Sequence, residues 1–141
     1  MNVADMMTAN PVTIRNDSTL RQAIELMHEH NFRHLPVVSV NSHLTGIISD
    51  RDCRLALNSP TLVRQRWQDE AVTDRTLVAS IMTTAPIVVE PATSAAEAAR
   101  LMIDHAISAL PVMRGETLVG IVTTSDILMA FIRLQRRGEE V

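Results

Sequence analysis

Apolar positions follow two spacings along the chain, and the same succession of spacings occurs twice. Leu20, Ala23, Ile24 and Met27 lie at i, i+3, i+4 and i+7, the spacing of one face of an amphipathic helix. Short runs rich in β-branched residues and bounded by turn-forming residues predict strands. The first copy is predicted as a strand at 12–14, a helix after Thr19, strands at 35–40 and 44–49, and a helix at 50–57. The second copy is predicted as a strand at 87–89, a helix after Ser94, strands at 110–114 and 117–123, and a helix at 124–134.

Comparison of the two copies shows that the repeat extends over nearly the whole chain. Met7-Thr8 with Pro11 recurs 75 positions later as Met82-Thr83 with Pro86. The same offset relates Leu35-Pro36-Val37 to Leu110-Pro111-Val112. After one deleted residue, Gly46-Ile47-Ile48-Ser49 and Asp52 match Gly120-Ile121-Val122-Thr123 and Asp126. Two related units of the order β-α-β-β-α, an α+β architecture, are therefore predicted.

The predicted helix starts carry a Ser or Thr followed three positions later by an acidic or amide side chain. Thr19 with Gln22 and Ser94 with Glu97 match the capping box at the first helix of each copy. At the second helix, Ser49 is followed by Asp52 and Thr123 by Asp126. The spacing alone favours helix capping for these pairs as well.

Composition and charge narrow the classes of function. Of the 141 residues 46% are apolar and only 2% aromatic, which predicts an aliphatic core that includes methionine. The formal net charge is −3, so no basic excess favours nucleic acid as a partner. The chain has no lysine, which excludes Schiff-base chemistry and a P-loop. No signal peptide or membrane-spanning run is recognised, and the lone Cys53 is expected to be a buried thiol, so we expect a cytoplasmic soluble protein.

The ordered set Met-Thr…Pro, Leu-Pro-Val and Gly-h-h-Ser/Thr-x-x-Asp (h, hydrophobic), present twice, resembles a pair of CBS domains, the arrangement called a Bateman module. The resemblance covers residues 3–57 and 78–134, with a connector at 58–77 and a polar tail at 135–141. It implies two units packed through their sheets about a pseudo-twofold, clefts between them, and a homodimer. The connector is expected to hold a short helix around Trp67, with Trp67 as a packing anchor.

In this family the clefts often hold adenosyl ligands such as AMP, ADP, ATP, NAD or S-adenosylmethionine. A helix N-terminus suits a phosphate, and an acidic side chain beside it suits the hydroxyls of a ribose. The resemblance therefore implies that Ser49 with Asp52, and Thr123 with Asp126, each contact a phosphate and a ribose. The further wall positions that it implies are Thr8, Pro11, Thr13, Arg33, His34, Pro36 and Arg51 in copy one, and Thr83, Pro86, Val88, Ile107, Ser108, Ala109, Pro111 and Ser125 in copy two. Strand and loop packing explains Val88, Ile107 and Pro111 equally well.

The two copies differ in charge at three of the predicted ligand-binding positions. Arg33, His34 and Arg51 in copy one stand where copy two has Ser108, Ala109 and Ser125. Because guanidinium groups bind phosphate through their fork of donors, we expect the two clefts to be inequivalent, although ordinary surface arginine explains the same residues.

No cluster of Cys or carboxylates surrounds His34 or His43, and no Ser-His-Asp set is recognised, so we expect neither a metal site nor an enzyme. The favoured function is a regulatory sensor of adenosyl ligands, which are regulatory ligands and not required cofactors. Its output is expected to pass through an unidentified target protein. A ligand-free module for dimerisation or protein interaction is the alternative. The apolar run at 127–132 suits either a dimer face or burial on its own sheet.

Overall fold

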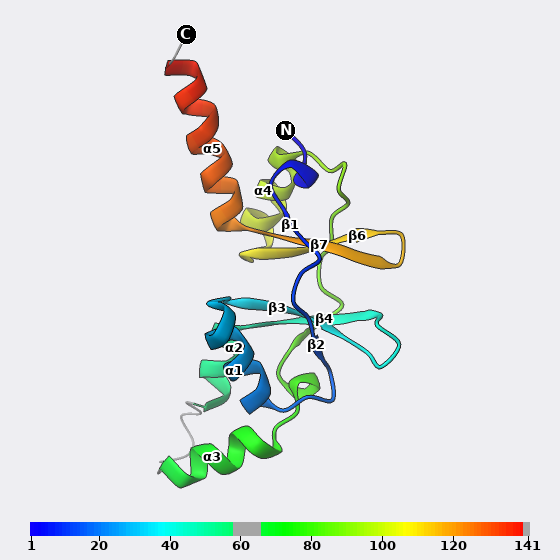
Figure 1. Ribbon diagram of the computed structural model, residues 1–141, viewed down its shortest axis with the longest axis vertical. Coiled ribbons are helices and arrows are strands. Elements are labelled where there is room, and N and C mark those ends of the chain that lie inside the picture. Colours follow the sequence, from blue (N-terminus) through cyan, green and yellow to red (C-terminus); the bar gives the residue numbers. More distant parts are fainter. Residues whose placement is uncertain (58–65, 140–141) are drawn as a thin grey trace. The chain divides into compact units, whose positions relative to one another are not determined.

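The computed structural model describes residues 1–57 and 66–139, which form two compact units (Figure 1). The first-repeat unit is Val12–Pro86. The second-repeat unit combines Met1–Pro11 with Ile87–Val141. The compact units and the sequence repeats therefore have different boundaries, because each unit includes a short segment that precedes the other repeat along the chain.

The first-repeat unit is built on a four-stranded sheet in the order β2-β3-β4-β5. β2 runs parallel to β3, and the other neighbours are antiparallel. The strands are β2 (Ile14–Arg15), β3 (His34–Val38), β4 (Leu44–Ser49) and β5 (Thr83–Thr84), and the helices are α1 (Leu20–His30), α2 (Asp50–Leu57), α3 (Arg66–Arg75) and the 3-10 turn η2 (Val78–Ser80).

The second-repeat unit is built on a three-stranded antiparallel sheet in the order β1-β7-β6. A single parallel bridge joins Val89 to Val112 at the place that β2 occupies in the other unit. The strands are β1 (Thr8–Ala9), β6 (Ala109–Arg114) and β7 (Thr117–Thr123), and the helices are η1 (Val3–Asp5), α4 (Ala95–His105) and α5 (Thr124–Glu139), with the short β5 of the other unit as the counterpart of β1.

Each unit has its own aliphatic core, and the two cores use equivalent positions. In the first-repeat unit the buried face of α1 supplies Leu20, Ala23 and Met27. In the second-repeat unit α4 supplies Ala98 and Met102. The hairpins complete the cores with Leu35, Val37 and Ile48 in one unit and Leu110, Val112 and Val122 in the other. The predicted helical periodicity thus marks the faces that are buried.

Gly46 and Gly120 lie on the hairpin strands where these pair with the short edge strands β5 and β1. A Cβ added to Gly46 would lie 2.6 Å from the carbonyl oxygen of Thr83 and 2.7 Å from Sδ of Met82. At Gly120 the same atom would lie 2.6 Å from Sδ of Met7. Because glycine has no Cβ, the backbone of β5 approaches Gly46 closely and the backbone of β1 approaches Gly120 closely.

The structure refines several element boundaries. The predicted strands at 35–40 and 110–114 are β3 and β6, and β4, β7 and α2 have the predicted bounds. The predicted strand at 12–14 is β2, displaced to Ile14–Arg15, and 87–89 contributes only the bridge at Val89. α5 continues through Glu139, beyond the predicted end near residue 134. A short helix, α3, begins at Arg66 in the connector, whereas residues 58–65 and the side chain of Trp67 lie outside the described part.

Candidate functional site

In the first-repeat unit, the start of β3 lies beside the junction of β4 and α2. His34 pairs with Ser49 in the register of the two strands. The backbone N–H of Asp50 donates a 2.8 Å hydrogen bond to the carbonyl oxygen of Arg33. The hairpin therefore brings Arg33 and His34 next to Ser49 and the first turn of α2, as the candidate site requires.

The second-repeat unit has the same arrangement with different side chains. Ala109 pairs with Thr123, and the N–H of Thr124 donates a 3.0 Å hydrogen bond to the carbonyl oxygen of Ser108. The Thr124 hydroxyl also contacts that oxygen, at 3.4 Å. Each unit thus closes its strand-to-helix junction with a backbone bond to the residue before the hairpin.

The first turns of α2 and α5 carry reciprocal capping bonds. The Ser49 N–H donates to Oδ2 of Asp52 at 2.8 Å, and the Asp52 N–H donates to Oγ of Ser49 at 3.1 Å. In the other unit the corresponding distances between Thr123 and Asp126 are 2.8 Å and 3.4 Å. The capping interpretation of both pairs is therefore confirmed. These bonds engage Oδ2 of each carboxylate and hold it at the helix start.

The control pairs at the first helices behave similarly. Thr19 and Gln22 form both bonds of the capping box at α1. At α4 the Glu97 N–H donates to Oγ of Ser94 at 3.0 Å. Capping is consequently a property of all four sites, and it does not by itself distinguish a ligand-binding helix start from a structural one.

The edge strands bring two further predicted residues to the hairpins. Thr83 of β5 pairs with Ile47, and Thr8 of β1 pairs with Ile121. Both threonines are exposed. Thr8 therefore belongs to the unit that carries Thr123 and Asp126, and Thr83 to the unit that carries Ser49 and Asp52. In the sequence analysis Thr8 is assigned to copy one and Thr83 to copy two. The strand pairing shows that each threonine lies in the unit of the other copy. No local signal in the sequence records this long-range pairing.

The remaining predicted residues lie at varied depths. Pro36 and Pro111 are fully buried within β3 and β6. The exposed members are Thr13, Arg33, Arg51, Val88, Ser108 and Ser125, the half-buried members are Pro11, His34, Pro86 and Ile107, and Ala109 is buried. The side chains that can meet a ligand directly are therefore mainly the polar members and Val88.

Burial governs the titration of two groups beside Asp52. Removal from solvent lowers the pKa of His34, Arg33 lowers it further, and Asp52 and Asp50 oppose the shift. The imidazole is consequently uncharged at neutral pH. Burial, followed by the charges of Asp52 and Asp50, raises the pKa of the Cys53 thiol to about 11. Cys53 is a buried, protonated thiol, as the sequence predicted.

Charge distinguishes the two junctions. Arg33 and Arg51 are exposed beside the first, and the equivalent Ser108 and Ser125 are exposed beside the second. Arg54 is paired with Asp50 at 3.6 Å, one turn away on α2.

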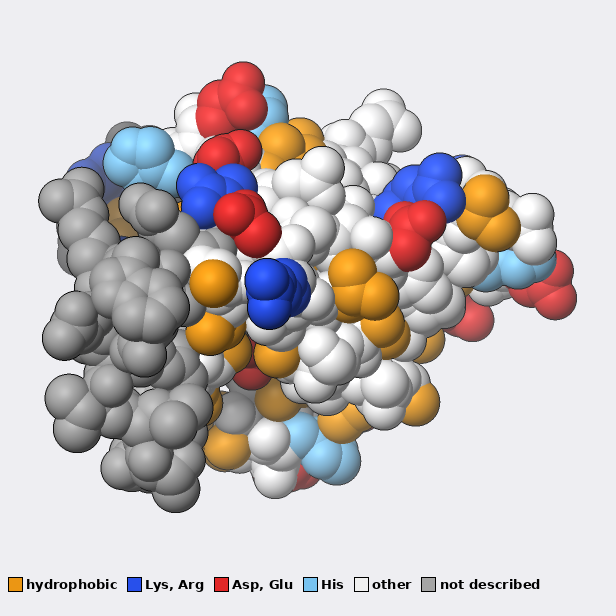
Figure 2. Space-filling model, turned by 90° about the horizontal axis from the view of Figure 1, so that it is seen from below, with side chains coloured by type: hydrophobic (Ala, Val, Ile, Leu, Met, Phe, Trp, Pro, Cys, Tyr) orange, Lys and Arg blue, Asp and Glu red, His pale blue; other side chains and the backbone are white. Residues whose placement is uncertain are grey.

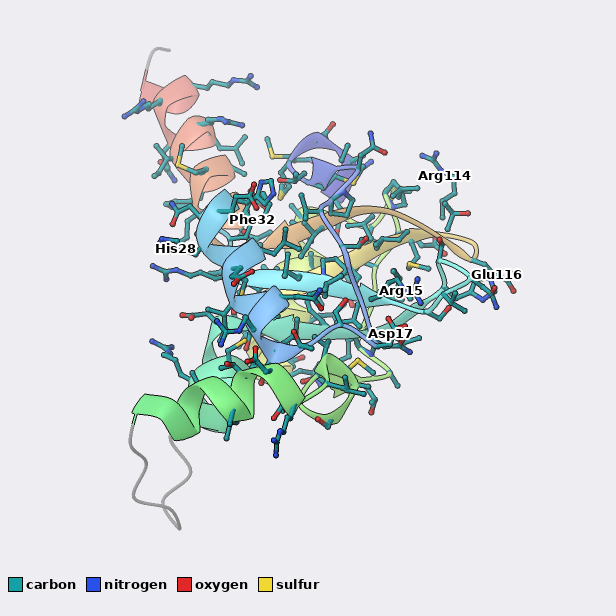
Figure 3. The ribbon with its side chains drawn as sticks, turned by 60° about the horizontal axis from the view of Figure 1, so that its bottom comes forward. Arg15, Asp17, His28, Phe32, Arg114 and Glu116 are labelled. Atoms are coloured by element: carbon teal, nitrogen blue, oxygen red, sulfur yellow. The ribbon has the colours of Figure 1, made fainter. Side chains whose placement is uncertain are left out.

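Elsewhere the surface carries charges of both signs. On the face drawn in Figure 2, arginines lie next to carboxylates. Arg15 and Asp17 form an ion pair, 2.7 Å apart, and both side chains are labelled in Figure 3.

An aromatic pair flanks the first junction. Phe32 follows the end of α1 (Figure 3), and its ring stacks on that of His30 with centroids 5.4 Å apart. Among the side chains that the structure describes, in residues 1–57 and 71–139, no group of three His, Cys, Asp or Glu is placed to hold a metal ion. Over the same residues, no helix combines the length and the apolar character needed to cross a membrane.

Comparison with known proteins identifies the family. The CBS domain profile matches residues 3–59 and 78–133, so this chain belongs to the CBS domain family and is a tandem CBS protein. A CBS domain-containing protein from Dictyostelium discoideum is 35% identical over 133 residues, which cover 94% of this chain and 92% of that protein.

Two similar solved structures contain adenosyl ligands. CBSX2 from Arabidopsis thaliana, in complex with AMP, is 31% identical with a TM-score of 0.78, and the match covers 94% of this chain and 97% of that one. The CBS domain pair of protein MJ0100, in complex with 5-methylthioadenosine and S-adenosylmethionine, is 27% identical with a TM-score of 0.80, over 93% and 95% of the two chains. CBS pairs of this fold therefore bind adenosyl compounds.

Proposed function

We propose that this chain is a regulatory module, not an enzyme, that binds an adenosyl ligand such as AMP, ADP, ATP, NAD or S-adenosylmethionine. Binding changes its conformation or its association with a target protein. One observation carries the proposal: similar CBS pairs of this fold hold AMP or S-adenosylmethionine. The Ser or Thr and the Asp that are bound to each other at the starts of α2 and α5 are the candidate contacts in this chain.

In this proposal each Asp has two roles. Oδ2 of Asp52 and of Asp126 already accepts the capping bond, so Oδ1 is the oxygen that accepts a ribose hydroxyl. The adjacent Ser49 or Thr123 hydroxyl and the first N–H groups of the helix face the phosphate or its equivalent. Exposed Thr83 and Thr8 on the edge strands add hydroxyl donors beside each junction. The capping box thereby orients the carboxylate before the ligand arrives.

Thermal unfolding tests the proposal. The chain is melted with AMP, ADP, ATP, NADH, S-adenosylmethionine or 5-methylthioadenosine. A ligand at 100 times its Kd stabilises the folded state by about 2.7 kcal/mol. Asp52→Ala and Asp126→Ala are each expected to weaken binding at their own junction at least about 10-fold, because a charged hydrogen bond to the ribose is lost.

The matched control is Gln22→Ala, which removes half of a capping box at a helix start with no proposed ligand. All three variants are expected to lose about 1 kcal/mol of stability from the missing cap. Only the aspartate variants are expected to lose ligand affinity. Absence of a shift with every adenosyl compound would favour the alternative, a ligand-free interaction module. A shift retained in the Asp52→Ala, Asp126→Ala double variant would remove the ribose assignment.

We further propose that the two junctions select different ligands. Arg33 and Arg51, beside the pair formed by His34 and Ser49, suit a ligand that bears phosphate. Ser108 and Ser125 suit an uncharged or cationic adenosyl compound, because they offer neutral hydroxyls. Ordinary solvent-exposed arginine is the competing interpretation, and calorimetric titration distinguishes the two.

In Asp126→Ala, which keeps the first-repeat junction, AMP is expected to bind at least about 10-fold tighter than 5-methylthioadenosine, a preference that weakens with added salt. The Arg33→Ser, Arg51→Ser variant, which installs the side chains of the second repeat, is expected to abolish this preference. In Asp52→Ala the preference is expected to be absent from the start. Equal phosphate dependence at both junctions would contradict the assignment.

We also propose that the chain acts as a homodimer, since association offers a route by which ligand binding reaches a target protein. Support comes from the exposed apolar side chains of Leu128, Phe131 and Ile132 on α5 of the second-repeat unit.

A further inference from the structure

In each unit a methionine thioether rests on the glycine of the repeated motif. A Cβ added to Gly46 would lie 2.7 Å from Sδ of Met82, and a Cβ added to Gly120 would lie 2.6 Å from Sδ of Met7. Met82 also packs against the core of the first-repeat unit, and Met7 against the core of the second. The same sulfur contact therefore occurs twice, between an edge strand and the hairpin with which that strand pairs.

These methionines join a buried turn to an edge strand. The N–H of Met82 donates a 2.9 Å hydrogen bond to the carbonyl oxygen of Val78 in η2, and the N–H of Met7 donates at the same distance to Val3 in η1. The next residue in each case begins the edge strand, β5 or β1, and each of these strands has only two residues. Because so short a strand forms few ladder bonds, packing of the thioether on the glycine contributes substantially to its attachment.

Solvent reaches both of these thioethers in part. Among the eight methionines of the chain, Met27 and Met102 lie in the cores at 6% exposure, whereas Met129 on α5 is 50% exposed. Met7 and Met82 have intermediate exposure. The two positions therefore combine access for a small oxidant with a packing role.

Oxidation converts this apolar contact into a polar group. The oxidant we consider is hydrogen peroxide. A lone pair of the thioether sulfur attacks one peroxide oxygen, the S–O bond forms and the O–O bond breaks, and the departing hydroxide takes the proton of the transferred hydroxyl and leaves as water. The sulfur is oxidised to a sulfoxide and the peroxide is reduced. The sulfoxide oxygen requires hydrogen-bond donors, which an aliphatic core does not provide, so the oxidised side chain favours solvent over its place on the glycine.

From this geometry we propose that Met82 and Met7 are sites of reversible oxidation by peroxide, and that formation of the sulfoxide loosens β5 and β1 from their hairpins. The strands loosen at Thr83 and Thr8, which directly follow the oxidised residues. Reduction of the sulfoxide by methionine sulfoxide reductases restores the contact. The inference goes beyond the proposed function, because it gives each unit a response to oxidants that requires no adenosyl ligand.

Hydrogen exchange of the full chain, followed by mass spectrometry after treatment with hydrogen peroxide, tests the proposal. Peptide mapping identifies the methionines that have gained an oxygen atom, and Met82 and Met7 are expected to be oxidised before the core methionines. Once Met82 is oxidised, exchange in 46–47 and 83–84 is expected to accelerate about 10-fold or more. Oxidation of Met7 is expected to have the same effect in 8–9 and 120–121. Methionine sulfoxide reductases A and B together are expected to reverse both changes.

Leucine variants separate the two sites. Met82→Leu and Met7→Leu keep an apolar side chain of similar volume and remove the oxidisable sulfur. Each is expected to protect the edge strand of its own unit and to leave the other unit sensitive, so each is a control for the other. Met113→Leu, which removes a half-buried methionine from β6, is expected to protect neither. Urea denaturation before oxidation checks that the variants fold, and the wild-type comparison decides the proposal where one does not.

Three outcomes would overturn the proposal. The first is oxidation of Met7 and Met82 no faster than that of Met27 and Met102. The second is unchanged exchange in both edge strands once their methionines are oxidised. The third is protection by Met113→Leu equal to that by Met82→Leu. An adenosyl-induced thermal shift, measured on the unoxidised chain, tests the ligand proposal separately from all three.

Discussion

At the residue scale, two glycines have a packing role and two aspartates have a capping role at the helix starts. Gly46 and Gly120 precede the functional junctions in the repeated motif, and their free space is filled by Met82 with Thr83 and by Met7 with Thr8. Their requirement is therefore structural. Asp52 and Asp126 have a demonstrated capping role and a proposed ligand role, which the same residue type serves because a carboxylate has two oxygens.

Gly46→Ala and Gly120→Ala are expected to lower the free energy of unfolding by about 1–3 kcal/mol each, because the new methyl overlaps a sulfur atom and a backbone oxygen. Gly138→Ala is the control. Its Cβ would meet nothing within 4 Å in α5, so a gain of about 0.5–1 kcal/mol is expected from helix propensity. Urea denaturation measures all three. A loss at Gly138 equal to that at Gly46 would contradict the packing explanation.

At the scale of elements, local signals predicted the helices and the hairpins well. The capping box at Thr19 locates the start of α1, and β4 and β7 have the predicted bounds. The errors occur where a boundary depends on a partner. Val12 and Thr13 are β-branched, yet β2 is only Ile14–Arg15, because just these residues pair with β3. α5 continues to Glu139 because Gln and Arg favour helix and no proline follows Leu134.

At the scale of the whole molecule, each unit contains the segment that precedes the other repeat along the chain. Val3 is fully buried in the core of the second-repeat unit, and its N–H bonds to the carbonyl oxygen of Thr93 at 2.8 Å. Val78, its equivalent, is buried in the core of the first-repeat unit and bonds to Ser18 at the same distance. Each unit is therefore completed by a segment distant in the sequence, since Val3 and Thr93 are 90 positions apart and Val78 and Ser18 are 60 positions apart.

Val3→Ala and Val78→Ala are each expected to cost about 2 kcal/mol through the cavities that they leave. Hydrogen exchange followed by mass spectrometry locates the damage. For Val3→Ala, exchange is expected to accelerate in 87–139, and for Val78→Ala in 14–57. Faster hydrogen exchange in 14–57 for Val3→Ala would contradict the assignment of Val3 to the second-repeat unit, because 14–57 is the repeat nearest to Val3 in sequence.

The sequence by itself determined the repeat, the order of elements, the buried helix faces and the residue types at each junction. These follow from local periodicity, capping chemistry and comparison of the copies. Only the tertiary structure decided which segments complete each unit and therefore which junction Thr8 and Thr83 join. It also decided that Leu128, Phe131 and Ile132 are exposed whereas Ala130 is buried. Burial and long-range strand pairing depend on contacts between residues far apart in the chain, and an apolar run alone does not record which of its sides is covered.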